Sequence, residues 1–233
     1  MSFFTSLSIL ILVSLIQASL QLVPSIFMIF YHYASGKKSR KNADSLALFF
    51  LLGVESFATI MFLSIYSIYY SVFFNFPSIE LKIFPWVLAG ITLALSIVSF
   101  FFYFRKSNGT ELFLSRKLAK NLLFRAKSVK TRSDAFALGF FTSIGELIFN
   151  LPLFVLAVVS INQFNDIPRS PFASLFIIAS AIPVISVFAM YHAGYNLAEI
   201  ERRRIKDKTF FRFVIPLGFL LLAFSLFSMG VFK

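Results

Sequence analysis

The sequence contains no cysteine and few charged residues. Of its 233 residues, 14% are charged, whereas about a quarter are charged in ordinary soluble chains. The absence of cysteine excludes disulfide frameworks and thiolate metal sites. Because a soluble domain of this size needs a polar exterior, the shortage of charge excludes a water-soluble enzyme or nucleic-acid-binding module.

Several catalytic motifs are also missing from the sequence. It has no Gly-x-Ser-x-Gly, no His-Glu-x-x-His and no glycine-rich phosphate loop. Lysine is absent from the interior of the apolar runs, apart from Lys82 at the edge of one of them, which argues against a retinal Schiff base. We therefore expect no enzyme activity, no cofactor and no metal site.

Long apolar runs dominate the rest of the chain. The residues AVILMFWYC make up 58% of it, and the mean hydropathy is +0.84. Each run has at least about 20 residues, which is enough to cross a hydrocarbon core of about 30 Å as a helix. This pattern predicts an all-α membrane protein with six transmembrane helices, at roughly residues 3–35, 45–75, 83–104, 134–161, 171–197 and 213–232.

Basic residues lie in three of the connections between these runs. The net charge is +12, and 19 of the 22 basic residues fall in connections 1–2, 3–4 and 5–6. Connections 2–3 and 4–5 contain only Lys82 and Arg169. By the positive-inside rule, the basic connections are cytoplasmic and both termini lie outside the cytoplasm. We therefore predict an integral protein of the cytoplasmic (plasma) membrane.

The central basic connection has an amphipathic pattern. Leu114, Leu118, Leu122 and Ala126 recur at a spacing of four residues. The positions between them are occupied by Arg116, Lys117, Lys120, Arg125 and Lys127. This pattern predicts a helix that lies on the anionic inner leaflet of the membrane. Docking of a cytoplasmic protein is the alternative interpretation.

Two acidic residues lie deep inside apolar runs. Glu55 follows Asp44 by 11 positions and Glu146 follows Asp134 by 12, which places each carboxyl about 16–18 Å into its span. An ionisable group at that depth costs a few kcal/mol unless it is paired, neutralised or hydrated. These carboxyl groups are therefore candidates for binding a solute or an ion. Two protonated glutamates that hydrogen-bond between helices are the structural alternative.

Polar pairs and prolines recur in the first span of each half of the chain. Gln17 and Gln21 are four residues apart, as are Glu146 and Asn150, so each pair is expected on one helix face. Proline follows each pair, at positions 24 and 152, and predicts helix breaks at Pro24 and Pro152. Because each half has three spans, the halves would cross in opposite directions, as in transporters with inverted repeats. Chance placement of glutamine and proline is the alternative.

One more proline and both histidines of the sequence also lie within the predicted spans. Pro183 is expected to kink the fifth span. His32 and His192 each follow a tyrosine near the inner ends of spans 1 and 5. With no carboxylate pattern beside either histidine, we interpret both as interfacial residues rather than as a metal or proton pair.

Three stretches of the sequence resemble the lysine-exporter (LysE) type of small transporters. They are Leu22-Val23-Pro24-Ser25 with the following Gly36-Lys37-Lys38-Ser39-Arg40 and Leu51-Leu52-Gly53-Val54, then Phe136-Ala137-Leu138-Gly139-Phe140 through Asn150-Leu151-Pro152, and finally Tyr195 through Arg202-Arg203-Arg204 to Pro216-Leu217-Gly218. The first helix of that family usually reads Pro-Gly-Pro, of which only Pro24 is present here. The family's contiguous Asn-Pro is separated here by Leu151. The resemblance implies a six-helix fold and export of a small solute.

These observations predict one polytopic domain over 1–233, with a first half at 1–104, a basic connection at 105–133 and a second half at 134–233. The expected function is secondary export of a small polar or cationic solute, such as an amino acid, with proton exchange at Glu55 or Glu146. Membrane lipids and the solute are the expected partners, and association with a second copy is left open. A partner-docking membrane subunit and a lipid or glycolipid transporter are the alternatives.

Overall fold

The computed structural model describes residues 3–37, 40–75, 84–103, 116–164 and 168–231, and in these segments all regular structure is helical. The predicted all-α class is confirmed for this part of the chain. In chain order the elements are α1 (Phe3–Ser19), α2 (Leu22–Lys37), α3 (Arg40–Asn75), α5 (Phe84–Val98), the π-helical turn η1 (Ser99–Tyr103), α6 (Arg116–Ser128), α7 (Arg132–Ile144), α8 (Leu147–Asn162), α9 (Ser170–Ala179), α10 (Ile182–His192) and α11 (Leu197–Val231).

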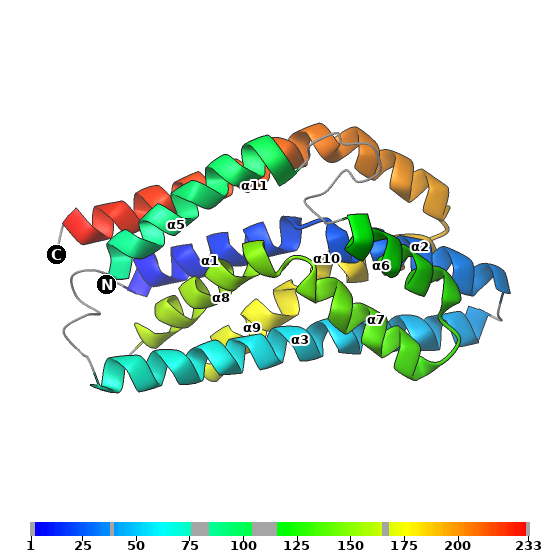
Figure 1. Ribbon diagram of the computed structural model, residues 1–233, viewed down its shortest axis with the longest axis horizontal. Helices are drawn as coiled ribbons and strands as arrows, with labels where there is room; N and C mark the ends of the chain where they lie inside the picture. Colours follow the sequence, from blue (N-terminus) through cyan, green and yellow to red (C-terminus); the bar gives the residue numbers. More distant parts are fainter. Residues whose placement is uncertain (1–2, 38–39, 76–83, 104–115, 165–167, 232–233) are drawn as a thin grey trace.

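The helices form an elongated bundle (Figure 1). Helices α1, α3, α5, α8 and α11 run close to its long axis, with α5 and α11 side by side along one edge and α3 along the opposite edge. Both chain ends lie at one end of the bundle. The end of α2 and the starts of α3, α7 and α11 lie at the other end. At each of the three basic connections, at least one helix end therefore lies away from the termini.

Two helical segments are long and apolar enough to cross a membrane, namely Phe4–Gly36 and Lys41–Val72. Two further pairs qualify as bent spans: α7 with α8, bent by 81°, and α9 with α10, bent by 56°. The described part of the chain thus has two to four candidate spans, which indicate a membrane location. Two shorter apolar helices, Pro85–Phe101 and Arg212–Ser228, lie in the remaining predicted spans.

The basic connection predicted between spans five and six is helical. Helix α11 has 35 residues and begins at Leu197, well before the apolar run that starts near residue 213. Residues 197–212 contain neither glycine nor proline, and ten of the 16 are leucine, alanine, glutamate, arginine or lysine, which favour a helix. The sequence identified this segment only as a basic connection, and the structure adds that it continues into the last apolar run as one helix.

The break between α1 and α2 follows from local backbone chemistry. Ser19 Oγ donates to the Leu15 carbonyl at 2.7 Å, and such back-bonding by serine bends helices. Pro24, in the first turn of α2, lacks the N–H that would continue the ladder from α1. The predicted break near Pro24 is therefore present, and it lies between Ser19 and Leu22.

The break between α7 and α8 lies at Gly145–Glu146, six residues before Pro152. Thr142 and Ser143 direct their hydroxyls to the carbonyls of Leu138 and Gly139, at 2.6 and 3.1 Å. These bonds and the following glycine end α7, whereas Pro152 lies inside α8. The prediction that Pro152 marks the break was wrong, because one missing N–H can be accommodated within a membrane helix.

The third break separates α9 from α10. Ser180 Oγ donates to the Ile177 carbonyl at 2.8 Å, and Pro183 lies in the first turn of α10. The kink predicted from Pro183 is confirmed by the 56° bend of this pair.

Two glycines allow α3 and α7 to pack backbone against backbone. A side chain at Gly53 would overlap the carbonyl oxygen of Phe136, and one at Gly139 would overlap the carbonyl oxygen of Phe50. Each glycine therefore lies against the residue three positions before the other one. Such contact between small residues is a recurrent way to pack helices in membranes.

The buried apolar residues that the structure describes form two clusters. One joins α1, α5, α8, α9, the second half of α3 and the later part of α11. The other joins α2, α6, α7, α10, the first half of α3 and the start of α11. The boundary between the clusters coincides with the three helix breaks, so this is where the bundle has room for polar groups.

Helix α6 packs on the bundle through part of its predicted apolar stripe. Leu122 and Ala126 are buried in the second cluster with residues of α2 and α7, while Leu118 is exposed. Leu114 lies outside the described residues. The basic side chains of Lys117, Lys120, Arg125 and Lys127 are exposed. The stripe is thus partly used for packing within the protein, and the charged face remains outward.

Candidate functional site

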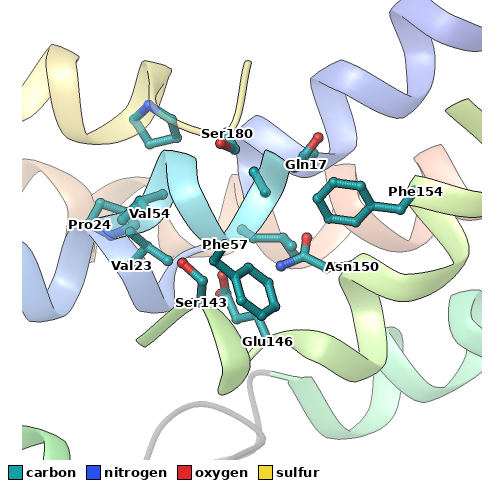
Figure 2. A pocket seen from close by; sticks show the side chains of 13 residues that line it. Gln17, Val23, Pro24, Val54, Phe57, Ser143, Glu146, Asn150, Phe154 and Ser180 are labelled. Atoms are coloured by element: carbon teal, nitrogen blue, oxygen red, sulfur yellow. The ribbon is translucent and has the colours of Figure 1, made fainter. Parts of the chain in front are cut away.

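A small polar pocket lies where the three helix breaks meet. Figure 2 shows Ser143, Glu146 and Asn150 on one side of it, with Gln17 and Ser180 across from them. Apolar residues from both core clusters complete the walls. The lining consists of Gln17, Leu20, Val23, Pro24, Val54, Phe57, Ala58, Ser143, Glu146, Asn150, Phe154, Ser180 and Pro183.

Glu146 links two of the breaks. It precedes α8 at the N-cap position and is 4% exposed. Its carboxylate oxygen Oε1 accepts a hydrogen bond from the backbone N–H of Leu22, the first residue of α2, at 2.7 Å. This N–H has no partner within its own helix, and the positive end of a helix dipole favours a carboxylate. The two broken spans are therefore joined at one carboxyl group.

Two amide side chains in the pocket have unpaired oxygens. Gln17 is 5% exposed and Asn150 is 7% exposed. Among the residues that the structure describes, neither Gln17 Oε1 nor Asn150 Oδ1 has a hydrogen-bond partner. An unpaired buried acceptor costs about 1–3 kcal/mol. Both side chains therefore mark a place that is suited to a group able to interact with oxygen.

The pocket is small, and none of the described residues that line it is basic. It offers about 20 Å³ to the centre of a water molecule, which is enough for about one water. In this conformation the space fits an ion or a water molecule rather than an amino acid. Within the described segments, no group of three or more His, Cys, Asp or Glu side chains is placed to hold a metal ion.

Glu55 lies beside the pocket and is only half buried. It does not line the pocket, and its Oε1 accepts a hydrogen bond from the Ser180 hydroxyl at 3.1 Å. The structure therefore brings both predicted acidic residues to the same region, but with different surroundings. Ser143 and Ser180 were missed in the sequence. Their position just before a break is the signal that could have identified them.

Gln21 does not join Gln17 in the pocket. Its Nε2 donates to the Ser19 carbonyl at 2.7 Å, and it is absent from the lining. The prediction of a shared face was wrong because the chain leaves the helix between Ser19 and Leu22, so helical spacing does not extend from Gln17 to Gln21. By contrast, Glu146 and Asn150 remain one turn apart, with Asn150 N–H bonded to Glu146 O at 2.9 Å.

His192 has a carboxylate partner that its sequence neighbourhood does not show. Its Nε2 lies 3.3 Å from Asp44 Oδ1, and the Tyr31 hydroxyl donates to the same oxygen. These residues come from α10, α3 and α2 and do not line the polar pocket. The sequence shows no carboxylate beside this histidine because Asp44 is 148 positions away in the chain, and the interfacial interpretation stays a prediction. His32 is exposed.

No protein-family model, curated protein or solved structure matches the chain. The resemblance to LysE-type transporters therefore stays a prediction, and the function has to be argued from the site itself.

Proposed function

We propose that the chain is an integral membrane secondary transporter that exports a small polar or cationic solute. The observation that carries the proposal is the meeting of three broken helices around one buried polar pocket. Spans with interrupted helices, whose freed backbone groups and polar side chains surround a site inside the membrane, are typical of secondary transporters. A helix interior that served only for packing would have no need of buried acceptors without partners.

The proposed topology has six spans in two inverted halves, with both termini outside the cytoplasm. Two features support it. The chain ends lie together at one end of the bundle, and the end of α2 and the starts of α3, α7 and α11, which flank the basic connections, lie at the other. The first span of each half is broken, at Ser19–Leu22 and at Ile144–Leu147, and the two breaks are joined by Glu146 and Leu22.

In the proposed mechanism, Glu146 responds to the movement of the halves. A carboxylate makes a stronger hydrogen bond to a backbone N–H than a protonated carboxyl does. Proton uptake at Glu146 would therefore weaken its bond to α2 and favour a change in the relative position of the broken spans. Glu55, already bonded to Ser180, acts as a structural partner.

A docking subunit is the second candidate, and α6 supports it. Phe124 is 73% exposed and shares this helix with exposed basic side chains, a combination suited to a cytoplasmic partner. A protein with that role would require the α6 surface and tolerate loss of Glu146. Transport would require Glu146 and tolerate changes of the exposed side chains of α6.

Efflux from proteoliposomes tests the proposal. Vesicles with the purified protein would be loaded with labelled amino acids or with monovalent or divalent cations, and efflux would be recorded with and without a pH gradient. Transport predicts efflux of at least one solute above that of protein-free vesicles. Efflux equal to that of protein-free vesicles for the whole panel would contradict the proposal.

A further inference from the structure

We propose that the pocket is a site for a dehydrated monovalent cation, of the alkali type, held by Gln17, Asn150 and Glu146. The inference rests on the proposed transport function and deepens it, since it names the class of cation that is carried.

The buried atoms of the pocket that lack a partner are amide oxygens. Gln17 Oε1 and Asn150 Oδ1 are both buried and unpaired among the described residues. Gln17 belongs to α1 and Asn150 to α8, so each of the first two broken spans contributes one of these oxygens to the pocket. Amide and carboxylate oxygens are the hard ligands that alkali and alkaline-earth cations prefer. A cation between these side chains would satisfy the two acceptors that the protein leaves unpaired.

The charge of the pocket lining matches that of a monovalent cation. Glu146 is the only ionisable side chain that lines the pocket, as far as the described residues show. Its single negative charge balances one positive charge. Ca²⁺ usually takes 6–8 oxygen ligands with several carboxylates, and Mg²⁺ retains several waters, for which this pocket lacks both charge and space. A monovalent cation is therefore the better match.

The volume of the pocket matches that of a single dehydrated ion. The space of about 20 Å³ suits one water-sized particle, and a bare alkali cation is of that size. An amino acid does not fit in this space, whose walls include Phe57 and Phe154. The pocket in this conformation is thus an ion site, and a larger solute would require the broken spans to move apart.

Thermal unfolding of the full-length protein in detergent tests the proposal. The chloride salts of Na⁺, K⁺, Li⁺, Mg²⁺ and N-methyl-D-glucamine would be compared at equal ionic strength. We expect at least one alkali cation to raise the Tm above the value in N-methyl-D-glucamine. A rise of about 5–10 °C corresponds to an ion present at 100 times its Kd in a chain of this size.

Two variants assign the effect to the pocket. Gln17→Met and Asn150→Leu keep the volume of each side chain and remove the unpaired oxygen, so their baseline stability should match or exceed that of the parent. Each should lose the alkali-dependent rise in Tm. Ser6→Ala is the matched control, because Ser6 Oγ is also buried and unpaired but lies outside the pocket, and this variant should keep the full rise.

The outcomes separate the ion site from transport. Equal Tm values in all salts, stabilisation by Mg²⁺ alone, or a rise retained in both pocket variants would overturn the ion site. An alkali-dependent rise that depends on the pocket, together with no efflux from proteoliposomes, would support the ion site and refute transport. Efflux without any alkali effect would refute the ion site and leave transport standing.

Discussion

Glu146 and Leu22 are 124 positions apart in the sequence and are joined by a buried hydrogen bond of 2.7 Å. The bond connects the carboxyl group at the α7–α8 break to the first N–H of α2. It is the kind of contact that transmits a local charge change to a whole helix, because removing the negative charge also removes its interaction with the helix dipole. The proposed coupling between proton binding and movement depends on this pair.

The topology can be tested with reporters. A reporter fused after Lys233 should lie outside the cytoplasm, and one inserted near Asn108 should lie inside it. Protease protection or a compartment-specific enzyme reporter measures both. The physical reason is the basic charge of the connections, which hinders their translocation. An Asn108 reporter on the outer side would contradict the six-span arrangement.

The crossing of α3 and α7 predicts the effect of adding one methyl group. Gly53→Ala and Gly139→Ala place a Cβ against a backbone carbonyl, and overpacking of this kind costs about 1–3 kcal/mol. Both variants should show a lower Tm in detergent. Gly90→Ala in α5 is the control, since a Cβ there meets nothing within 4 Å. An equal Tm for all three variants and the parent would refute the close approach.

Helix α6 provides a matched pair of substitutions. Leu122 is 2% exposed and Phe124 is 73% exposed. Leu122→Ala should destabilise the protein by about 2–5 kcal/mol, because it leaves a cavity against α2 and α7. Phe124→Ala should change stability by less than about 0.5 kcal/mol. Unfolding in denaturant measures both, and a small effect at Leu122 would show that α6 is not anchored to the bundle.

Features that depend on composition and local order could be predicted from the sequence. The all-α class, the buried position of Glu146 and Asn150 and the kink at Pro183 follow from hydropathy, spacing and the chemistry of proline. The break at Gly145–Glu146 was misplaced, since proline was weighted above the back-bonding of Thr142 and Ser143. Serine and threonine are common in apolar helices, so their presence alone does not distinguish a break from a continuous helix.

Features that depend on contacts between distant segments could not be predicted. The bond from Leu22 to Glu146 and the pairing of His192 with Asp44 join residues that no sequence spacing relates. Gln21 shows the opposite error, because helical spacing was applied across a point where the helix stops. Unpaired oxygens on Gln17 and Asn150 are likewise visible only once the packing around them is known.

The proposed coupling role of Glu146 is tested most directly by Glu146→Gln. Glutamine keeps an oxygen that accepts from Leu22 and removes the exchangeable proton and the charge, so expression and Tm should stay close to those of the parent. Glu55→Gln is the matched control, because it changes the second deep carboxyl, which bonds Ser180 and does not line the pocket.

The decisive measurement is efflux from proteoliposomes driven by a pH gradient, recorded for the parent and both variants with the solute that the parent carries. If Glu146 couples proton movement to export, Glu146→Gln abolishes gradient-driven efflux, whereas Glu55→Gln retains it. Efflux by Glu146→Gln with the rate and pH dependence of the parent would contradict the account and leave Glu146 a purely structural role.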